Sequence, residues 1–194
     1  MFDTLKDYCR QTIPFTDKEL ELIEAYFEPK TLEKKELLLE NGNSCNFIAF
    51  IVEGAIRHYH IKDGAEKTCD ISLENTWVTD FQSFTNGSPC VLNLETVNKT
   101  TVLTIRRQNL SHLYQVCPKY ETFGRIMAER VAQRATKIAM SLSSDRPEER
   151  FQKLIREQPG LLQRVPQKYL ASLIGVSPES LSRIRRRILQ KSKS

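Results

Sequence analysis

The sequence predicts an α+β fold in three parts: an antiparallel β-sandwich or roll, one long helix, and a C-terminal helix-turn-helix. Three observations predict it. Residues 31–105 hold short segments rich in β-branched and aromatic residues, separated by turn signals such as Asn41-Gly42-Asn43. Residues 120–143 contain no proline and carry a continuous apolar stripe. Residues 166–188 read as two short helices around a glycine turn.

The first part begins with two predicted helices, over residues 5–13 and 17–27, the second capped by Thr16 or Asp17. The predicted strands cover residues 36–39, 48–52, 55–61, 68–73, 92–97 and 101–105. Short strands at close spacing with no helices between them favour an antiparallel arrangement. A short helix over residues 109–115 should follow and end before Pro118.

The apolar stripe of the long helix steps by four or three residues through Phe123, Met127, Val131, Ala135, Ile138 and Leu142. At 1.5 Å per residue the helix is about 35 Å long, which is longer than a small roll can cover. One interpretation packs the stripe on the helix's own domain. We favour the other, in which a second copy of the chain shares it as the seam of a homodimer.

The segment from Ser143 to Pro147 interrupts the long helix. Asp145, with Glu148 three residues later, has the spacing of a capping box and predicts a new helix over residues 146–157. The predicted divisions are therefore residues 1–117 for the roll, 118–144 for the dimerisation helix and 145–194 for the helix-turn-helix domain.

The helix-turn-helix pattern combines turn chemistry with two helix faces. Gly175 stands where a helix ends in a left-handed residue, and Ser177 and Pro178 suit the cap and first position of the next helix. One face of that second helix is apolar, with Leu181, Ile184 and Ile188. The opposite face is polar and basic, with Glu179, Ser182, Arg183 and Arg186. Such a helix suits the major groove of DNA, whereas the alternative is a solvated basic helix.

The charge of the chain supports the first interpretation. From Asp145 onward there are 12 Lys and Arg against 5 Asp and Glu, while the preceding 144 residues hold 17 against 19. This asymmetry predicts a polyanion as the partner of the C-terminal segment, and the helix-turn-helix pattern identifies that polyanion as double-stranded DNA. The residues expected to reach base edges are Ser177, Pro178, Glu179, Ser182, Arg183 and Arg186. Those expected near phosphates are Gln167, Lys168, Arg185 and Arg187.

Other features limit the class of protein. The longest apolar run, residues 47–52, is far too short to span a membrane, and the first residues are charged where a secretory signal would be apolar. We therefore expect a cytoplasmic protein without membrane contact. The five cysteines are scattered, which favours reduced thiols. No nucleophilic triad, phosphate-binding loop, dinucleotide motif or cofactor motif is present, so we expect no enzyme activity and no cofactor.

Three stretches carry a resemblance to a known family: residues 47–57 (FIAFIVEGAIR), residues 63–67 (DGAEK) and residues 175–183 (GVSPESLSR). They are similar to the strand-Gly-strand hairpin, the next turn and the DNA-reading helix of the cyclic-AMP receptor protein and Fnr (Crp/Fnr) family of bacterial transcription regulators. The resemblance implies a double-stranded β-helix of the cyclic-nucleotide-binding type and a winged-helix-like domain, here expected to lack the wing. It also implies dimers on two-fold symmetric sites, RNA polymerase as a partner, and a small-molecule effector in the roll.

The resemblance also shows where this chain departs from the family. Pro178 replaces the arginine that usually accompanies Glu179 and Arg183, so the preferred DNA sequence should differ. The family's cyclic-phosphate cassette of Gly-Glu and Arg-Ser aligns with Thr79-Asp80 and Cys90-Val91, and no Lys or Arg occurs between Lys67 and Lys99. A buried phosphodiester needs a cation, so we expect no cyclic-AMP binding. A pocket for another effector would include His58, Asp80, Cys90 and Val91.

A second hypothesis comes from His58 and His60, which alternate along a predicted strand and should face the same side. This spacing is similar to that of cupin-like rolls, in which a metal enzyme would use both rings. A further ligand is not evident, since the remaining histidine, His112, lies in a helical segment. The metal enzyme is therefore the alternative to the DNA-binding regulator.

Overall fold

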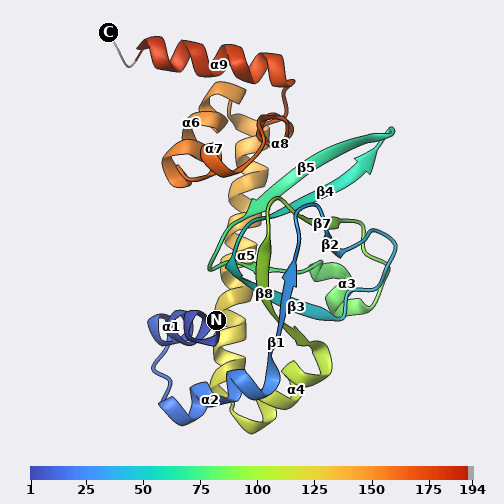
Figure 1. The fold of residues 1–194 in the computed structure, drawn as a ribbon, viewed down its shortest axis with the longest axis vertical. Helices are drawn as coiled ribbons and strands as arrows, with labels where there is room; N and C mark the ends of the chain where they lie inside the picture. The colour runs from blue at the N-terminus through green and yellow to red at the C-terminus, as the bar shows by residue number, and fades with distance from the viewer. Residues whose placement is uncertain (192–194) are drawn as a thin grey trace.

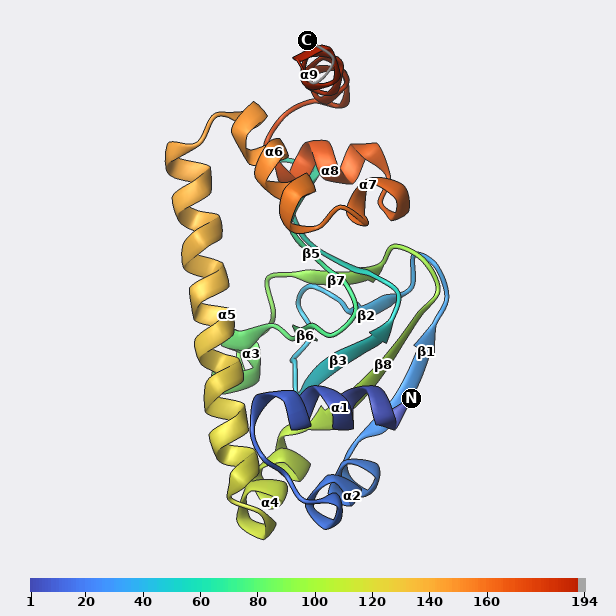
Figure 2. The ribbon, with the colours of Figure 1, turned by 90° about the vertical axis from the view of Figure 1, so that its left-hand side faces the viewer.

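The computed structural model describes residues 1–191 and shows a roll of two antiparallel sheets packed along a long helix, α5 (Lys119–Ser144). The other helices are α1 (Phe2–Thr12), α2 (Asp17–Tyr26), α3 (Phe81–Asn86), α4 (Arg107–Val116), α6 (Pro147–Glu157), α7 (Leu161–Arg164), α8 (Gln167–Leu173) and α9 (Pro178–Lys191). Helices α1, α2 and α4 surround one end of α5, and α6 to α9 gather at its other end (Figures 1 and 2).

The first sheet has the order β1 (Glu28–Leu32), β8 (Thr100–Arg106), β3 (Phe47–Glu53), β6 (Trp77–Val78). The second has the order β2 (Leu37–Leu39), β7 (Asn93–Thr96), β4 (Ile56–Lys62), β5 (Ala65–Ser72). Every paired strand is antiparallel. Side chains from both sheets, such as Ala49, Ile51 and Leu94, fill the space between them. The predicted α+β class and antiparallel roll are confirmed.

Four elements were not predicted: strands β1 and β6 and helices α3 and α7. β1 reads Glu-Pro-Lys-Thr-Leu, and only its last residue is buried. It exists because its backbone pairs with β8 at the edge of the sheet, a position that tolerates Pro29. β6 has two residues, and its pairing with β3 is equally non-local.

The first half of the apolar stripe of α5 belongs to the chain's own core. Phe123 and Met127 are 5% and 8% exposed and pack with residues of α1, α2, β3 and β8. Their prediction as dimer-seam residues is therefore wrong, because the N-terminal helices and the roll already cover them. Val131, Ala135 and Leu142 are exposed, and Ile138 is half-buried.

A break between α5 and α6 lies where the sequence predicts it, but the cap differs. Helix α6 begins after Arg146, whose backbone N–H donates to the Glu149 carboxylate at 2.7 Å. Asp145 is not the capping residue. Its carboxylate instead accepts from Ser141 Oγ at 2.6 Å and from Lys153 Nζ at 2.7 Å. These contacts hold the bend between the two helices.

The C-terminal helices dock directly on the roll. Ala55, Ile71 and Val97 of the roll share one apolar cluster with Phe151, Leu161, Leu170, Ile174 and Leu181 of the C-terminal helices. Around this cluster, Arg164 donates to Glu74 and to the carbonyl of Gly54. The backbone N–H of Thr68 donates to Ser172 Oγ at 2.9 Å.

One buried cation lies at this junction. Arg57 on β4 is 1% exposed, and its guanidinium lies between the rings of Tyr59 and Tyr169, 4.1 Å and 4.0 Å from their centroids. It donates to Thr68 Oγ1 at 2.9 Å and to Glu66 at 2.7 Å. Because Tyr169 belongs to α8, this arginine ties the helix-turn-helix to the roll. No helix within residues 1–191 is long and apolar enough to cross a membrane.

Candidate functional sites: a nucleic-acid interface and a cavity beside α5

The turn between α8 and α9 has the geometry that the sequence indicates. Gly175 has φ = 77°, a left-handed conformation that is cheap only for glycine. The backbone N–H of Val176 donates to the carbonyl of Ala171 at 2.9 Å, which closes the end of α8. Ser177 then caps α9, because its hydroxyl accepts from the backbone N–H of Ser180 at 3.2 Å. The two helices are therefore fixed by local interactions.

The two faces of α9 have different surroundings. Leu181 and Ile184 are buried against the rest of the domain. The residues expected to reach base edges all lie on the exposed surface: Ser177, Pro178, Glu179, Ser182, Arg183 and Arg186. Helix α9 lies at the end of the molecule farthest from α2 and α4 (Figure 1).

Glu179 and Arg183 are held by the cap region. Hydrogen bonds from its own backbone N–H and from the Ser177 hydroxyl lower the pKa of Glu179, so it stays a carboxylate. Arg183 Nη2 donates to Ser180 Oγ at 3.1 Å and is otherwise directed along the exposed face. The site thus offers an acceptor and a five-donor cation one turn apart.

The residues expected at phosphates have different roles in the structure. Gln167 Nε2 donates both to the carbonyl of Pro178 at 3.0 Å and to Ser182 Oγ at 2.6 Å, so its amide joins α8 to α9. Both N–H groups of this amide are used within the domain, and the expected position of Gln167 near phosphates stays a prediction. Arg187 pairs with Glu148 of α6 at 3.3 Å. Lys168 is exposed, and Arg185 is half-buried.

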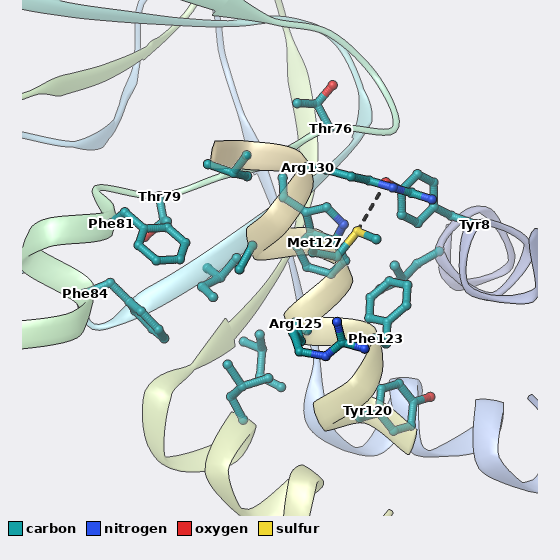
Figure 3. Close-up of a pocket in the computed structure, with 18 of the residues that line it drawn as sticks. Tyr8, Thr76, Thr79, Phe81, Phe84, Tyr120, Phe123, Arg125, Met127 and Arg130 are labelled. Carbon is teal, nitrogen blue, oxygen red and sulfur yellow. Dashed lines mark hydrogen bonds between the residues drawn. The ribbon is translucent and has the colours of Figure 1, made fainter. Parts of the chain in front are cut away.

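A cavity of about 820 Å³ lies between α5 and the roll (Figure 3). Its walls come from one face of α5, one face of α4, the two phenylalanines of α3, and strands β3 to β6. In Figure 3, Phe81 and Phe84 approach from α3, opposite Tyr8 of α1, whose hydroxyl donates to Met127 Sδ at 3.3 Å. The lining is mostly apolar, and the volume is typical of small-molecule sites.

Of the four residues expected in an effector pocket, only His58 lines this cavity. The Asp80 carboxylate is used as the cap of α3, accepting from the backbone N–H of Ser83 at 3.0 Å and of Val91 at 3.2 Å. Cys90 is buried in the core of the roll and donates to the carbonyl of Glu40, while the Val91 side chain is exposed. Asp80, Cys90 and Val91 therefore do not line this cavity, and a role for them in another pocket stays a prediction.

The histidines do not form a metal site in the described part of the chain. His58 Nε2 lies 3.1 Å from Ser72 Oγ, and burial lowers the pKa of His58, so its ring is neutral. His112 lies 3.1 Å from the hydroxyl of Tyr26, on the other side of the molecule from β4. Within residues 1–191 no three His, Cys, Asp or Glu side chains gather as metal ligands. The hypothesis of a metal enzyme that uses His58 and His60 is not supported.

Comparison with known proteins agrees with this architecture. The family model of the cyclic nucleotide-binding domain matches residues 29–117. The structure of FixK2 from Bradyrhizobium japonicum is 15% identical, with 86% of each chain covered and a TM-score of 0.73. The c-di-GMP responsive global regulator CLP of Xanthomonas campestris is also 15% identical, with 91% of this chain and 93% of that chain covered and a TM-score of 0.72.

The catabolite activator protein of Thermus thermophilus is 18% identical over 92% of this chain and 86% of that chain, with a TM-score of 0.56. No curated protein sequence matches. The arrangement of a roll, a long helix and a C-terminal helical domain is therefore a fold that this chain shares with these solved structures. More specifically, residues 29–117 match the model of the cyclic nucleotide-binding domain, and the chain shares its overall fold with FixK2 and CLP.

Proposed function

We propose that this protein is a DNA-binding transcription regulator of the Crp/Fnr type, which binds as a homodimer to a two-fold symmetric site on double-stranded DNA. The observation that carries the proposal is the exposed, arginine-bearing face of α9, opposite buried Leu181 and Ile184. An α-helix with these two faces fits the major groove. Such a regulator acts in the cytoplasm and has RNA polymerase as a further partner.

Arg183 and Glu179 are the proposed base-reading pair. Arginine can donate to guanine O6 and N7 together, and a carboxylate can accept from cytosine N4. The lowered pKa of Glu179 keeps it in the acceptor state. Ser177, Pro178, Ser182 and Arg186 share the same surface. Lys168 and Arg185 flank it and are the proposed phosphate contacts, because neither has its cation paired with a carboxylate in the described residues.

The test is selection of bound fragments from random DNA, followed by titration of the selected site. Arg183→Ala should weaken binding to that site by about 1–3 kcal/mol and affect random DNA little. Lys168→Ala should weaken binding to all sequences and lower the salt slope by about one. Arg125→Ala is the control, because Arg125 lies on α5 far from α9 and pairs with Glu129.

Two outcomes would count against the proposal. One is an affinity that does not depend on salt concentration. The other is equal loss by Arg183→Ala on selected and random DNA, which would leave Arg183 without a role in reading sequence.

Cyclic AMP is not the proposed effector. The aligned cassette supplies Asp80, whose carboxylate is occupied by two backbone N–H groups, and Cys90, which is buried in the core. Neither offers a cation for a cyclic phosphate. Calorimetry with millimolar cyclic AMP should therefore give no binding heat, and a dissociation constant in the low micromolar range would contradict this.

A further inference from the structure

We infer that the cavity beside α5 binds a small organic acid: an apolar aromatic or aliphatic body that carries one acidic group. This goes beyond the proposed function, since it concerns a site that lies away from α9 and needs no DNA. The argument rests on three properties of the cavity walls. They are the shape of the apolar lining, two buried donors without acceptors, and an excess of arginine.

The apolar lining is built by helix faces rather than by loops. On α4, residues 107, 110, 111 and 114 follow helical spacing and all face the cavity. On α5, residues 124, 127, 128, 131 and 135 do the same. Gly124 matters here because a Cβ at this position would lie 2.2 Å from the hydroxyl of Tyr114. The walls therefore come close at that end, and Phe81 and Phe84 of α3 line the cavity as well (Figure 3).

Two donors in this lining have no acceptor among the described residues. Trp77 Nε1 and Arg107 Nε are both buried from solvent and make no hydrogen bond. Buried N–H groups are normally paired, because leaving one unpaired costs free energy. Trp77 packs against the rings of Phe50 and Phe123, and its Nε1 is buried from solvent. A bound molecule with acceptor atoms would accept hydrogen bonds from both of these N–H groups.

The guanidinium of Arg107 indicates that the bound molecule carries a negative charge. Its guanidinium stacks 5.1 Å from the centre of the Phe84 ring, and Nη2 donates to the carbonyl of Ser83 at 3.2 Å. No carboxylate of residues 1–191 pairs with it. A half-buried arginine without a counter-ion, held against an aromatic wall, suits a carboxylate or a similar anion.

The charged side chains of the whole lining also favour an anionic ligand. Arg107, Arg125, Arg130 and Arg134 line the cavity, against Asp70 and Glu121. Arg134 is paired with Asp70 at 2.6 Å and Arg125 with Glu129 at 2.5 Å, so Arg107 and Arg130 are the lining arginines without a carboxylate partner in residues 1–191. The volume of 820 Å³ suits a molecule of drug size, and the apolar walls favour a hydrocarbon body. The acidic group would lie at Arg107, with a second acceptor atom at Trp77.

The experiment compares two probes that differ in one group. 8-Anilinonaphthalene-1-sulfonate carries an acidic group, and N-phenyl-1-naphthylamine has the same rings without it. Trp77 is the one tryptophan of the chain, so its fluorescence reports directly on this cavity. The sulfonate should bind with quenching of Trp77 and at least about tenfold more tightly than the uncharged amine. Decanoate should displace the sulfonate more readily than decan-1-ol.

Matched variants test whether the acidic group of the probe binds at Arg107. Arg107→Gln should weaken the sulfonate about tenfold and leave the uncharged probe unchanged. Arg106→Gln is the control, because the neighbouring arginine is exposed and does not line the cavity. Ala128→Phe, which fills the cavity from α5, should weaken both probes. Circular dichroism and the emission of Trp77 without probe show whether each variant is folded.

Three results would overturn the inference. They are equal affinity for the two probes, equal effects of Arg107→Gln and Arg106→Gln, and sulfonate binding that leaves Trp77 fluorescence unchanged. If Arg107→Gln does not fold, Ala128→Phe decides the location, and the ratio of the two probe affinities in the natural protein decides the charge.

Discussion

The two halves of α5 follow one sequence pattern but have different surroundings. In the core half, residues 119–128, Tyr120, Phe123 and Met127 are buried by α1, α2, α4 and the roll. In the free half, residues 129–144, Met140 and Leu142 are 64% and 53% exposed. In Figure 2 the roll and the N-terminal helices lie on one side of α5, and no element of residues 1–191 lies on its other side.

The two halves of α5 therefore serve different packing partners. The core half is needed for the fold of the chain itself. The free half is joined to the roll through Arg134, which donates to Asp70 through two nitrogens at 2.6 Å and 3.0 Å, and it leaves an apolar strip in solvent. Val131 and Leu142, 39% and 53% exposed, share one face of the helix, whereas Met140 lies on the opposite face, and Val131 also lines the cavity beside α5. Exposed apolar side chains along one helix face are typical of an interface. We propose that a second copy of the chain covers it.

The largest expected effect comes from placing a glutamate in each half of α5 and comparing the stability of the two variants. Met127→Glu should destabilise the protein by about 3–5 kcal/mol or more, because it removes a packed side chain and buries a carboxylate. Met140→Glu is the matched control, and it should change the free energy of unfolding by less than about 0.5 kcal/mol per folded chain. Urea unfolding measures both. Similar losses in the two variants would mean that the halves do not differ.

The second prediction tests the partner of the free half. Val131→Glu combined with Leu142→Glu should weaken the dimer by about 2–4 kcal/mol, since each adds a charge to an apolar interface. Sedimentation at micromolar concentration should then give monomers, with unchanged circular dichroism. The contradicting result is a wild-type protein that sediments as a monomer, or a double variant that remains a dimer.

Sequence reasoning identified the helix-turn-helix because its signals are local. Gly175 and Ser177 act on their own backbone neighbourhood, and the faces of α9 follow from helical spacing alone. The same reasoning could not divide α5, because an apolar stripe is required both by a chain's own core and by a second chain. Which half is covered depends on where α1 and α2 fold back, and no periodicity encodes that.

The cavity was predictable only in part. His58 was identified from its strand, but Trp77 and Arg107 were not, since they are thirty residues apart and meet only through the pairing of β6 and β8 with β3. Asp80, Cys90 and Val91 were chosen by alignment with a cassette whose chemistry this chain lacks. The one available signal was the absence of Lys and Arg from residues 68–98, which argued against cyclic AMP and for a less anionic ligand but could not identify Arg107 on α4.

The last and smallest effect concerns the point where the free half of α5 meets the roll. His58 lies in the cavity wall near Asp70 and Arg134, and its pKa is lowered, first by burial and further by the Arg134 charge, while Asp70 opposes the shift. Because the folded state holds this ring neutral, the unfolded state binds more protons below its ordinary pKa of about 6.5. The stability that His58 contributes is complete above that pH and is lost as the pH falls toward the lowered pKa.

The slope between these two pKa values is at most about 1.4 kcal/mol per pH unit. His58→Gln should therefore flatten the fall in stability between pH 6.5 and pH 5, measured by urea unfolding at several pH values. Arg134→Gln should flatten it partly, because it removes one of the two causes of the lowered pKa and frees the Asp70 carboxylate to favour the charged ring. If His58→Gln keeps the full slope, the acid sensitivity arises elsewhere, and the junction between the free half and the roll does not depend on the charge of His58.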